Sequence, residues 1–155
     1  MAFDSSLQVE IWKRVIDSQE HFNDIGMRIR ALTLTATTLA LSAAGLVYVN
    51  TSSIQVFGAT VSPAAFVPLL GLIPTLAFWN LDVYWFYRLL RGAVEESKRL
   101  EQGLRSHGVS VRLNREISEM KPSAGKNLYI LYGMLGAIQL IVSIAIVVVG
   151  PVASA

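Results

Sequence analysis

Charged and uncharged stretches alternate along the chain in long blocks. No Asp, Glu, Lys or Arg occurs between Ala31 and Leu81, and none follows Lys126. A charged side chain at the centre of a bilayer costs about 3 kcal/mol even on the mildest insertion scale. A water-soluble domain of this size has no need of such uncharged runs, so the pattern predicts a membrane protein.

Three apolar stretches are long enough to cross a membrane as helices, which takes roughly 20 residues. The first leads directly out of a charged segment. The second follows Pro63 and ends in a cluster of aromatic rings that is typical of a membrane interface. Gly150 and Pro151 close the third. The predicted spans are residues 31–49, 64–87 and 127–149.

Basic residues are concentrated on one side of these spans. The connection 88–126 contains nine Lys and Arg residues, whereas the connection 50–63 contains none. The positive-inside rule therefore places residues 1–30 and the connection 88–126 in the cytoplasm. The loop 50–63 and the tail 150–155 are then predicted to lie outside.

Both predicted cytoplasmic parts have helical patterns. Within residues 5–30, apolar side chains recur at spacings of three, four and seven, and charges take the other face. This amphipathic helix either continues into the first span or lies on the membrane and turns at Gly26. Residues 88–106 extend the second span towards a stop at Gly108, and a short helix after it completes a hairpin. The predicted fold class is an all-α membrane protein: three transmembrane helices, an N-terminal amphipathic helix and a short cytoplasmic helical hairpin.

Composition and motifs narrow the chemistry. The 155 residues are 53% hydrophobic and include no cysteine and only two histidines, His21 and His107. Disulfides, thiolate metal sites and cysteine nucleophiles are thereby excluded, and no phosphate-binding, dinucleotide-binding or catalytic-triad motif occurs. The cytoplasmic parts are too short for an ordinary enzyme domain. We expect no catalytic residues, no metal and no cofactor.

Asp82 is the most informative single residue, because an ionisable side chain inside a span is a functional candidate by default. In one interpretation it pairs with Arg28 or Arg30, which enter the membrane at a similar depth on the first helix. In the other, Asp82 and the neighbouring Asn80 line a pore or gate, and the two arginines form a ring at its cytoplasmic mouth. Basic residues at a mouth favour anions.

Small and hydroxylated side chains are unusually frequent in the first span. Small residues four positions apart let helix backbones approach closely, which predicts a packing seam within the monomer or between copies. The hydroxyl groups allow a second interpretation, a polar wall for water or ions. A similar small patch occurs in the third span. The seam candidates are Ala36, Ala40, Ala44, Gly133 and Ala137, and the wall candidates are Thr33 and Thr37.

The stretches Glu10–Lys13 and His21–Arg30, followed directly by a span of small residues, look like an N-terminal pattern of small bacterial membrane proteins. The layout resembles SLATT-type membrane effectors of bacterial anti-phage defence, over residues 10–45 of this chain. The resemblance carries over no binding residues. It implies a homo-oligomer in the bacterial inner membrane that perturbs or permeabilises the membrane when a cytoplasmic protein or small-molecule signal engages it.

Two functions follow from these observations. We expect a homo-oligomeric membrane effector or ion channel controlled from the cytoplasmic side; the alternative is a non-conducting scaffold or accessory subunit that docks a cytoplasmic partner. An intramembrane enzyme would need paired carboxylates or a His-Asp set within the bilayer. Acidic residues are interspersed among the bases of 88–126, so membrane lipid, and not nucleic acid, is the expected additional partner.

Overall fold

The computed structural model describes residues 5–106 and 124–150, and 90% of the described residues are helical. Three stretches among them are long and apolar enough to cross a membrane, judged by length and composition: Ser6–Asn50, Pro63–Arg105 and Gly125–Val149. The prediction of three apolar, membrane-compatible helices is confirmed at this level. The second helix of the expected hairpin lies outside the described residues.

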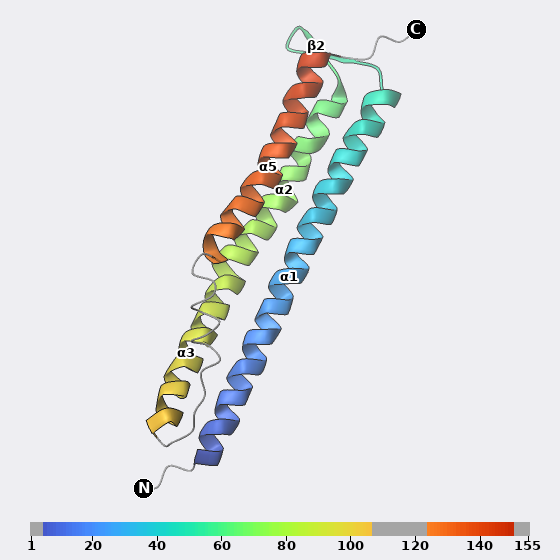
Figure 1. Cartoon of the computed structure of the whole chain (residues 1–155). Coiled ribbons are helices and arrows are strands. Elements are labelled where there is room, and N and C mark those ends of the chain that lie inside the picture. The colour runs from blue at the N-terminus through green and yellow to red at the C-terminus, as the bar shows by residue number, and fades with distance from the viewer. Residues whose placement is uncertain (1–4, 107–123, 151–155) are drawn as a thin grey trace. The chain divides into compact units, whose positions relative to one another are not determined.

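The chain order of the elements is simple and can be followed in Figure 1. Among the described residues, one long helix is joined by a small β-hairpin to a second, compound helix, and a further helix follows in residues 124–149. The elements are α1 (Ser5–Asn50), β1 (Ile54–Val56), β2 (Ala59–Val61), η1 (Pro63–Ala65), α2 (Phe66–Asn80), η2 (Leu81–Phe86), α3 (Tyr87–Ser106) and α5 (Ala124–Val149).

Helix α1 runs for 46 residues without interruption. It passes through Gly26, which is buried, and does not turn there. The expected amphipathic helix and the first span therefore form one helix. A single Gly inside a helix costs only about 1 kcal/mol, which the surrounding helix-forming and apolar positions offset.

The connection after α1 contains a β-hairpin that the sequence analysis did not predict. β1 pairs with β2 antiparallel, with Val56 opposite Ala59. The two turn residues, Phe57 and Gly58, have φ angles of 49° and 83°. Positive φ at both central positions is what a type I′ turn requires, and this turn matches the natural twist of two paired strands.

The second predicted span is a compound element. Pro63 opens the short η1 helix at a position where its missing N–H costs nothing. Pro74 lies inside α2 without ending it. At Leu81 the helix widens into the π-helical segment η2, and it tightens again at Tyr87 into α3, which ends at Ser106. A π-helical turn is rare and is often found at functional sites.

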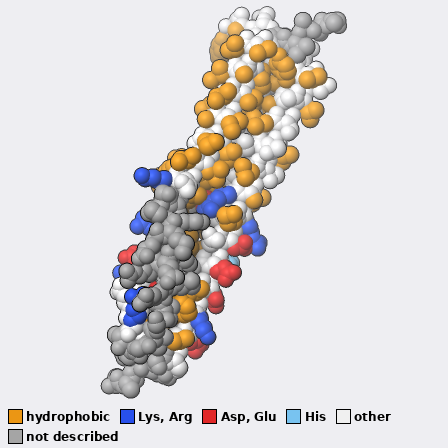
Figure 2. Space-filling model, in the orientation of Figure 1, with side chains coloured by type: hydrophobic (Ala, Val, Ile, Leu, Met, Phe, Trp, Pro, Cys, Tyr) orange, Lys and Arg blue, Asp and Glu red, His pale blue; other side chains and the backbone are white. Residues whose placement is uncertain are grey.

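Internal contacts divide the chain into two compact units. The apolar unit comprises Ile29–Asn80 and Leu128–Ala155, and the charged unit comprises Met1–Arg28 and Leu81–Asn127. Arg30 is the one charged residue in the sequence of the apolar unit. Figure 2 shows hydrophobic side chains covering the visible face of the apolar unit and charged side chains gathered over the charged unit.

In the apolar unit, α1 and α5 run parallel, because Thr37 bonds Gln139 and Tyr48 bonds Gly150, each pair 102 residues apart. The constant separation shows that the two helices keep one register. Helix α2 runs antiparallel to both, since it starts at the hairpin end. This three-helix packing forms the core that positions the candidate site.

In the charged unit, α1 packs against α3, where Gln19 donates a hydrogen bond of 3.0 Å to the carbonyl of Ala93. Apolar and small side chains of α3 recur at spacings of three and four, and the stripe that they form faces inward, with Ser97 and Leu104 fully buried. On the outside, Arg99 lies 3.9 Å from Glu95, as its spacing of four predicts. The spacing of four between Glu101 and Arg105 predicts a second ion pair on the outside of this helix, but the Glu101 side chain lies on the inside. It is 2% exposed because it shares the inward face with Ser97 and Leu104.

Candidate functional site

A buried amide joins all three helices of the apolar unit. The Gln139 side chain from α5 is 0% exposed. Its Nε2 donates to Thr37 Oγ1 of α1 at 3.1 Å and to Thr75 Oγ1 of α2 at 2.9 Å. The hydroxyl of Thr75 in turn donates to the carbonyl of Gly71 at 3.0 Å. Polar groups in an apolar medium must find partners inside the protein, so this network fixes the mutual rotation of the three helices.

Two further hydrogen bonds lie between the Gln139 network and the β-hairpin end of the bundle. Ser143 Oγ donates to the carbonyl of Ala65 at 2.6 Å, and Tyr48 Oη donates to the carbonyl of Gly150 at 2.9 Å. The first joins α5 to η1 and the second joins α1 to the end of α5. Each interhelical hydrogen bond in a membrane contributes about 0.6 kcal/mol on average. Together they indicate a specifically packed bundle.

Gly71 allows the helices to approach closely beside this network. A Cβ atom added at Gly71 would lie 2.6 Å from Ala40 Cβ and 3.1 Å from Gln139 Oε1. The Gln139 Oε1 atom is buried and has no hydrogen-bond partner among the described residues. A carbonyl packed against a glycine in this way can form a weak Cα–H···O contact. The site is thus tightly filled by protein.

Most of the candidate side chains in the first span are buried or half-buried within the protomer. Thr33 and Thr37 are 0% and 4% exposed, and Ala44 is 1% exposed. Ala36 and Ala40 are half-buried on the same side of α1, and Ala40 contacts the Gly71 position of α2. The seam of small residues predicted for the first span therefore includes packing within one protomer.

The opposite side of α1 carries a second small and hydroxylated stripe that the sequence analysis did not separate from the first. Its residues recur at alternating spacings of four and three, so they lie on one helix face. All are exposed, and a Cβ on Gly45 would meet nothing within 4 Å. We call this the outer face of α1; it comprises Ala31, Thr35, Thr38, Ser42 and Gly45.

The charged candidates occupy different environments. Asp82, in the first turn of η2, is 1% exposed. Arg28 forms an ion pair of 2.9 Å with Asp24, and both side chains are more than half exposed. Arg30 is half-buried, and Asn80 is exposed at the last position of α2. A buried acidic side chain within a π-helical turn makes Asp82 a candidate functional residue of the charged unit.

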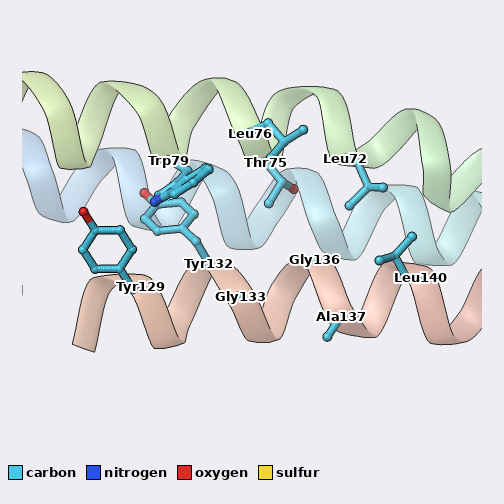
Figure 3. A pocket seen from close by; sticks show the side chains of 10 residues that line it. All are labelled: Leu72, Thr75, Leu76, Trp79, Tyr129, Tyr132, Gly133, Gly136, Ala137 and Leu140. Carbon is cyan, nitrogen blue, oxygen red and sulfur yellow. The ribbon is translucent and has the colours of Figure 1, made fainter. Parts of the chain in front are cut away.

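Helices α2 and α5 border a groove of about 430 Å³, shown in Figure 3. The seam candidates Gly133 and Ala137 lie on its α5 wall and are exposed. Trp79 and Tyr129 meet edge to face at one end, with ring centroids 6.2 Å apart. The lining is Leu72, Thr75, Leu76, Trp79, Tyr129, Tyr132, Gly133, Gly136, Ala137 and Leu140.

These arrangements suit packing and recognition. Within residues 5–106 and 124–150, no group of three or more His, Asp or Glu side chains could hold a metal ion. Sequence reasoning missed Gln139, although an amide within an otherwise apolar span was a readable signal. It also missed the groove, because a groove depends on two helices whose facing sides a sequence pattern does not identify.

Comparison with family models, with curated proteins and with solved structures found no match to this chain.

Proposed function

We propose that the protein is a homo-oligomeric integral membrane protein that acts as a membrane-perturbing effector or ion channel, controlled from the cytoplasmic side. The main support for this proposal is the composition of the outer face of α1. A helix side that contacts only lipid tails can be covered by bulky apolar side chains at no cost in stability. Small and hydroxylated residues are instead typical of sides where helices pack against each other. On α1 the outer face is small and hydroxylated from Ala31 to Gly45, and the bulky Val49 follows at the end of the predicted span.

Association of copies through the outer face follows from the physics of helices in lipid. Lipid tails are as apolar as leucine, so helices associate by close packing and by hydrogen bonds between polar side chains. Gly45 and Ala31 permit close approach. Ser42, Thr38 and Thr35 place hydroxyl groups along the same line, where several copies around an axis would present them to a conduit.

Charge supports the cytoplasmic control and the ion preference. Arg28 precedes Ala31 on the same helix, and its side chain is 76% exposed. In an oligomer these arginines would form a ring beside a ring of their ion-pair partners, Asp24, and the arginine ring would lie nearer the span, where it favours anions. By the positive-inside rule the charged unit faces the cytoplasm of a bacterium, where α1 and α3 can receive a protein or small-molecule signal.

One observation favours the second candidate, a non-conducting scaffold. The hydroxyls of Thr35 and Thr38 donate to the carbonyls of Ala31 and Leu34 in their own helix, at 3.0 and 2.9 Å. Hydroxyls satisfied in this way tolerate a dry interface. The outer face would then hold copies together without admitting water, and the charged unit would dock a cytoplasmic partner.

Single-cysteine variants test the oligomer directly, because the natural chain has no cysteine. Ser42→Cys should form disulfide-linked dimers on mild oxidation in vesicles. Val148→Cys, at a position that is 79% exposed on α5, is the matched control, and its yield of disulfide-linked dimer should be several-fold lower. Equal yields from the two variants would reject the outer face as the seam.

Ion flux through the same vesicles then separates the two candidates. We expect chloride flux from the natural protein and at least a tenfold loss in Thr38→Leu, in which a bulky side chain replaces a hydroxyl on the outer face. A chain that cross-links through Ser42→Cys but conducts nothing, with or without added bacterial lysate, would establish the scaffold and exclude the channel.

A further inference from the structure

The groove between α2 and α5 is open and almost wholly apolar. Its polar groups are the Thr75 hydroxyl, which already donates to the carbonyl of Gly71, and the tips of its aromatic rings. Figure 3 shows the leucines of α2 on one wall and the glycines of α5 on the other. Such a lining offers dispersion and exclusion from water, so the ligand it suits is a hydrocarbon.

The length of the groove suits an extended alkyl chain. On α5 the lining extends from Tyr129 to Leu140, about 16 Å at 1.5 Å per residue. The groove has a volume of about 430 Å³ and is open on one side. An apolar groove of this length has room for a single extended alkyl chain.

Glycine keeps this space open on the α5 wall. A Cβ atom on Gly133 would meet nothing within 4 Å, and one on Gly136 would meet only Leu72 Cδ2, at 3.8 Å. Neither glycine is required by close packing between helices, in contrast to Gly71. The empty volume at these positions is therefore available to a ligand.

Charge along α5 indicates the headgroup. The lining residues Tyr129, Gly133, Gly136 and Leu140 follow spacings of four and three, and the same spacing leads back one turn to Lys126, which is exposed. Trp and Tyr rings prefer the headgroup region of a bilayer, and Trp79 and Tyr129 mark that end of the groove. A lysine one turn beyond such rings complements a phosphate.

We propose that the groove between α2 and α5 binds one acyl chain of an anionic phospholipid, with its phosphate beside Lys126. The chain lies along Gly133 and Gly136, and the glycerol end lies at the Trp79–Tyr129 pair. This inference rests on the three apolar helices being embedded in a membrane. It does not rest on oligomer formation or on conduction.

Fluorescence of Trp79 reports on the groove. The chain has three tryptophans, so Trp12→Phe with Trp85→Phe leaves Trp79 as the single emitter. The full-length protein is reconstituted in vesicles that contain increasing fractions of phosphatidylglycerol or phosphatidylcholine with brominated acyl chains, which quench on contact. Half-maximal quenching should need about fivefold less phosphatidylglycerol, the preference that one lysine near the surface supplies.

Two variants separate the chain site from the headgroup site. Gly133→Leu fills the groove from a position with free space, and it should lower maximal quenching at least twofold with both lipids. Lys126→Gln should retain quenching but remove the fivefold preference. Val148→Leu, on an exposed position outside the lining, should change neither.

Two results would reject the proposed lipid site. Identical half-maximal fractions for the two lipids, unaffected by Lys126→Gln, would reject the anionic headgroup. Quenching that Gly133→Leu leaves unchanged would reject the acyl chain in the groove. Because the readout is lipid contact, neither result depends on whether the cysteine and flux experiments support the oligomeric channel.

Discussion

Gly71 and Gln139 show how single residues decide the packing of the apolar unit. Gln139 offers one amide to both neighbouring helices, and its Nε2 finds two threonine hydroxyls. That geometry is possible only because Gly71 leaves room beside the amide oxygen. The glycine and the glutamine therefore depend on each other, and we expect the effects of substitutions at the two positions on stability to be non-additive.

Gly71→Ala should destabilise the apolar unit. The added methyl group would lie 2.6 Å from Ala40 Cβ, so α1 and α2 must separate, at a cost of about 1–3 kcal/mol as in other overpacked cores. Thermal unfolding in detergent, followed by circular dichroism, measures the loss. Adding Ala40→Gly should recover much of it. Gly133→Ala, where a Cβ meets nothing within 4 Å, is the control and should not destabilise. Equal losses from both glycines would contradict the close approach.

At the scale of elements, the β-hairpin depends on an unusual turn. Phe57 has a φ of 49°, a conformation that costs a residue with a side chain roughly 1–2 kcal/mol. Its side chain is completely exposed, so no contact with the described residues offsets this cost. Asparagine tolerates this conformation, and Asn-Gly is the preferred sequence of a type I′ turn.

Phe57→Asn should therefore stabilise the hairpin. Amide hydrogen exchange within β1 and β2 is the measurement, and we expect exchange to slow roughly fivefold, the equivalent of about 1 kcal/mol. Gly58→Ala, at a φ of 83°, is the opposite control and should speed exchange. Faster exchange in Phe57→Asn would show that the phenylalanine side chain supports the hairpin.

The elements also show how far the sequence could predict the fold. The apolar helices could be predicted, because the hydrophobicity that drives a segment into a membrane is a local property. The π-helical turn at Leu81 and the β-hairpin could not. The first has no distinct residue pattern, and the second is encoded by Phe57-Gly58, a poor match to the usual turn residues.

The candidate site was harder to predict for a different reason. The small residues of α1 form two stripes on opposite sides of the helix, one packed in the protomer and one exposed. Periodicity shows that Ala40 and Ala44 share a face, but it does not say which face meets α2. That choice depends on Gly71 and Gln139, which are distant in sequence.

At the scale of the whole molecule, the division by contacts and the division by charge coincide. The boundaries of the apolar unit fall at Ile29, Asn80 and Leu128, each close to a transition between charged and uncharged sequence. Polar solvent and lipid favour different surfaces, so a chain that separates its charges in this way is suited to both. We expect the charged unit to lie on one side of the membrane and the β-hairpin on the other.

Labelling of single cysteines from one side of the membrane tests this arrangement. Ser18, on α1 in the charged unit, and Thr60, in β2, are both exposed. In intact bacterial cells freed of the outer membrane, an impermeant maleimide should label Thr60→Cys at once and Ser18→Cys only after lysis, because the positive-inside rule predicts that the charged unit lies in the cytoplasm. The natural chain, without cysteine, gives the background. Labelling of both variants from outside would mean that α1 does not cross the membrane, and it would overturn the orientation on which cytoplasmic control rests.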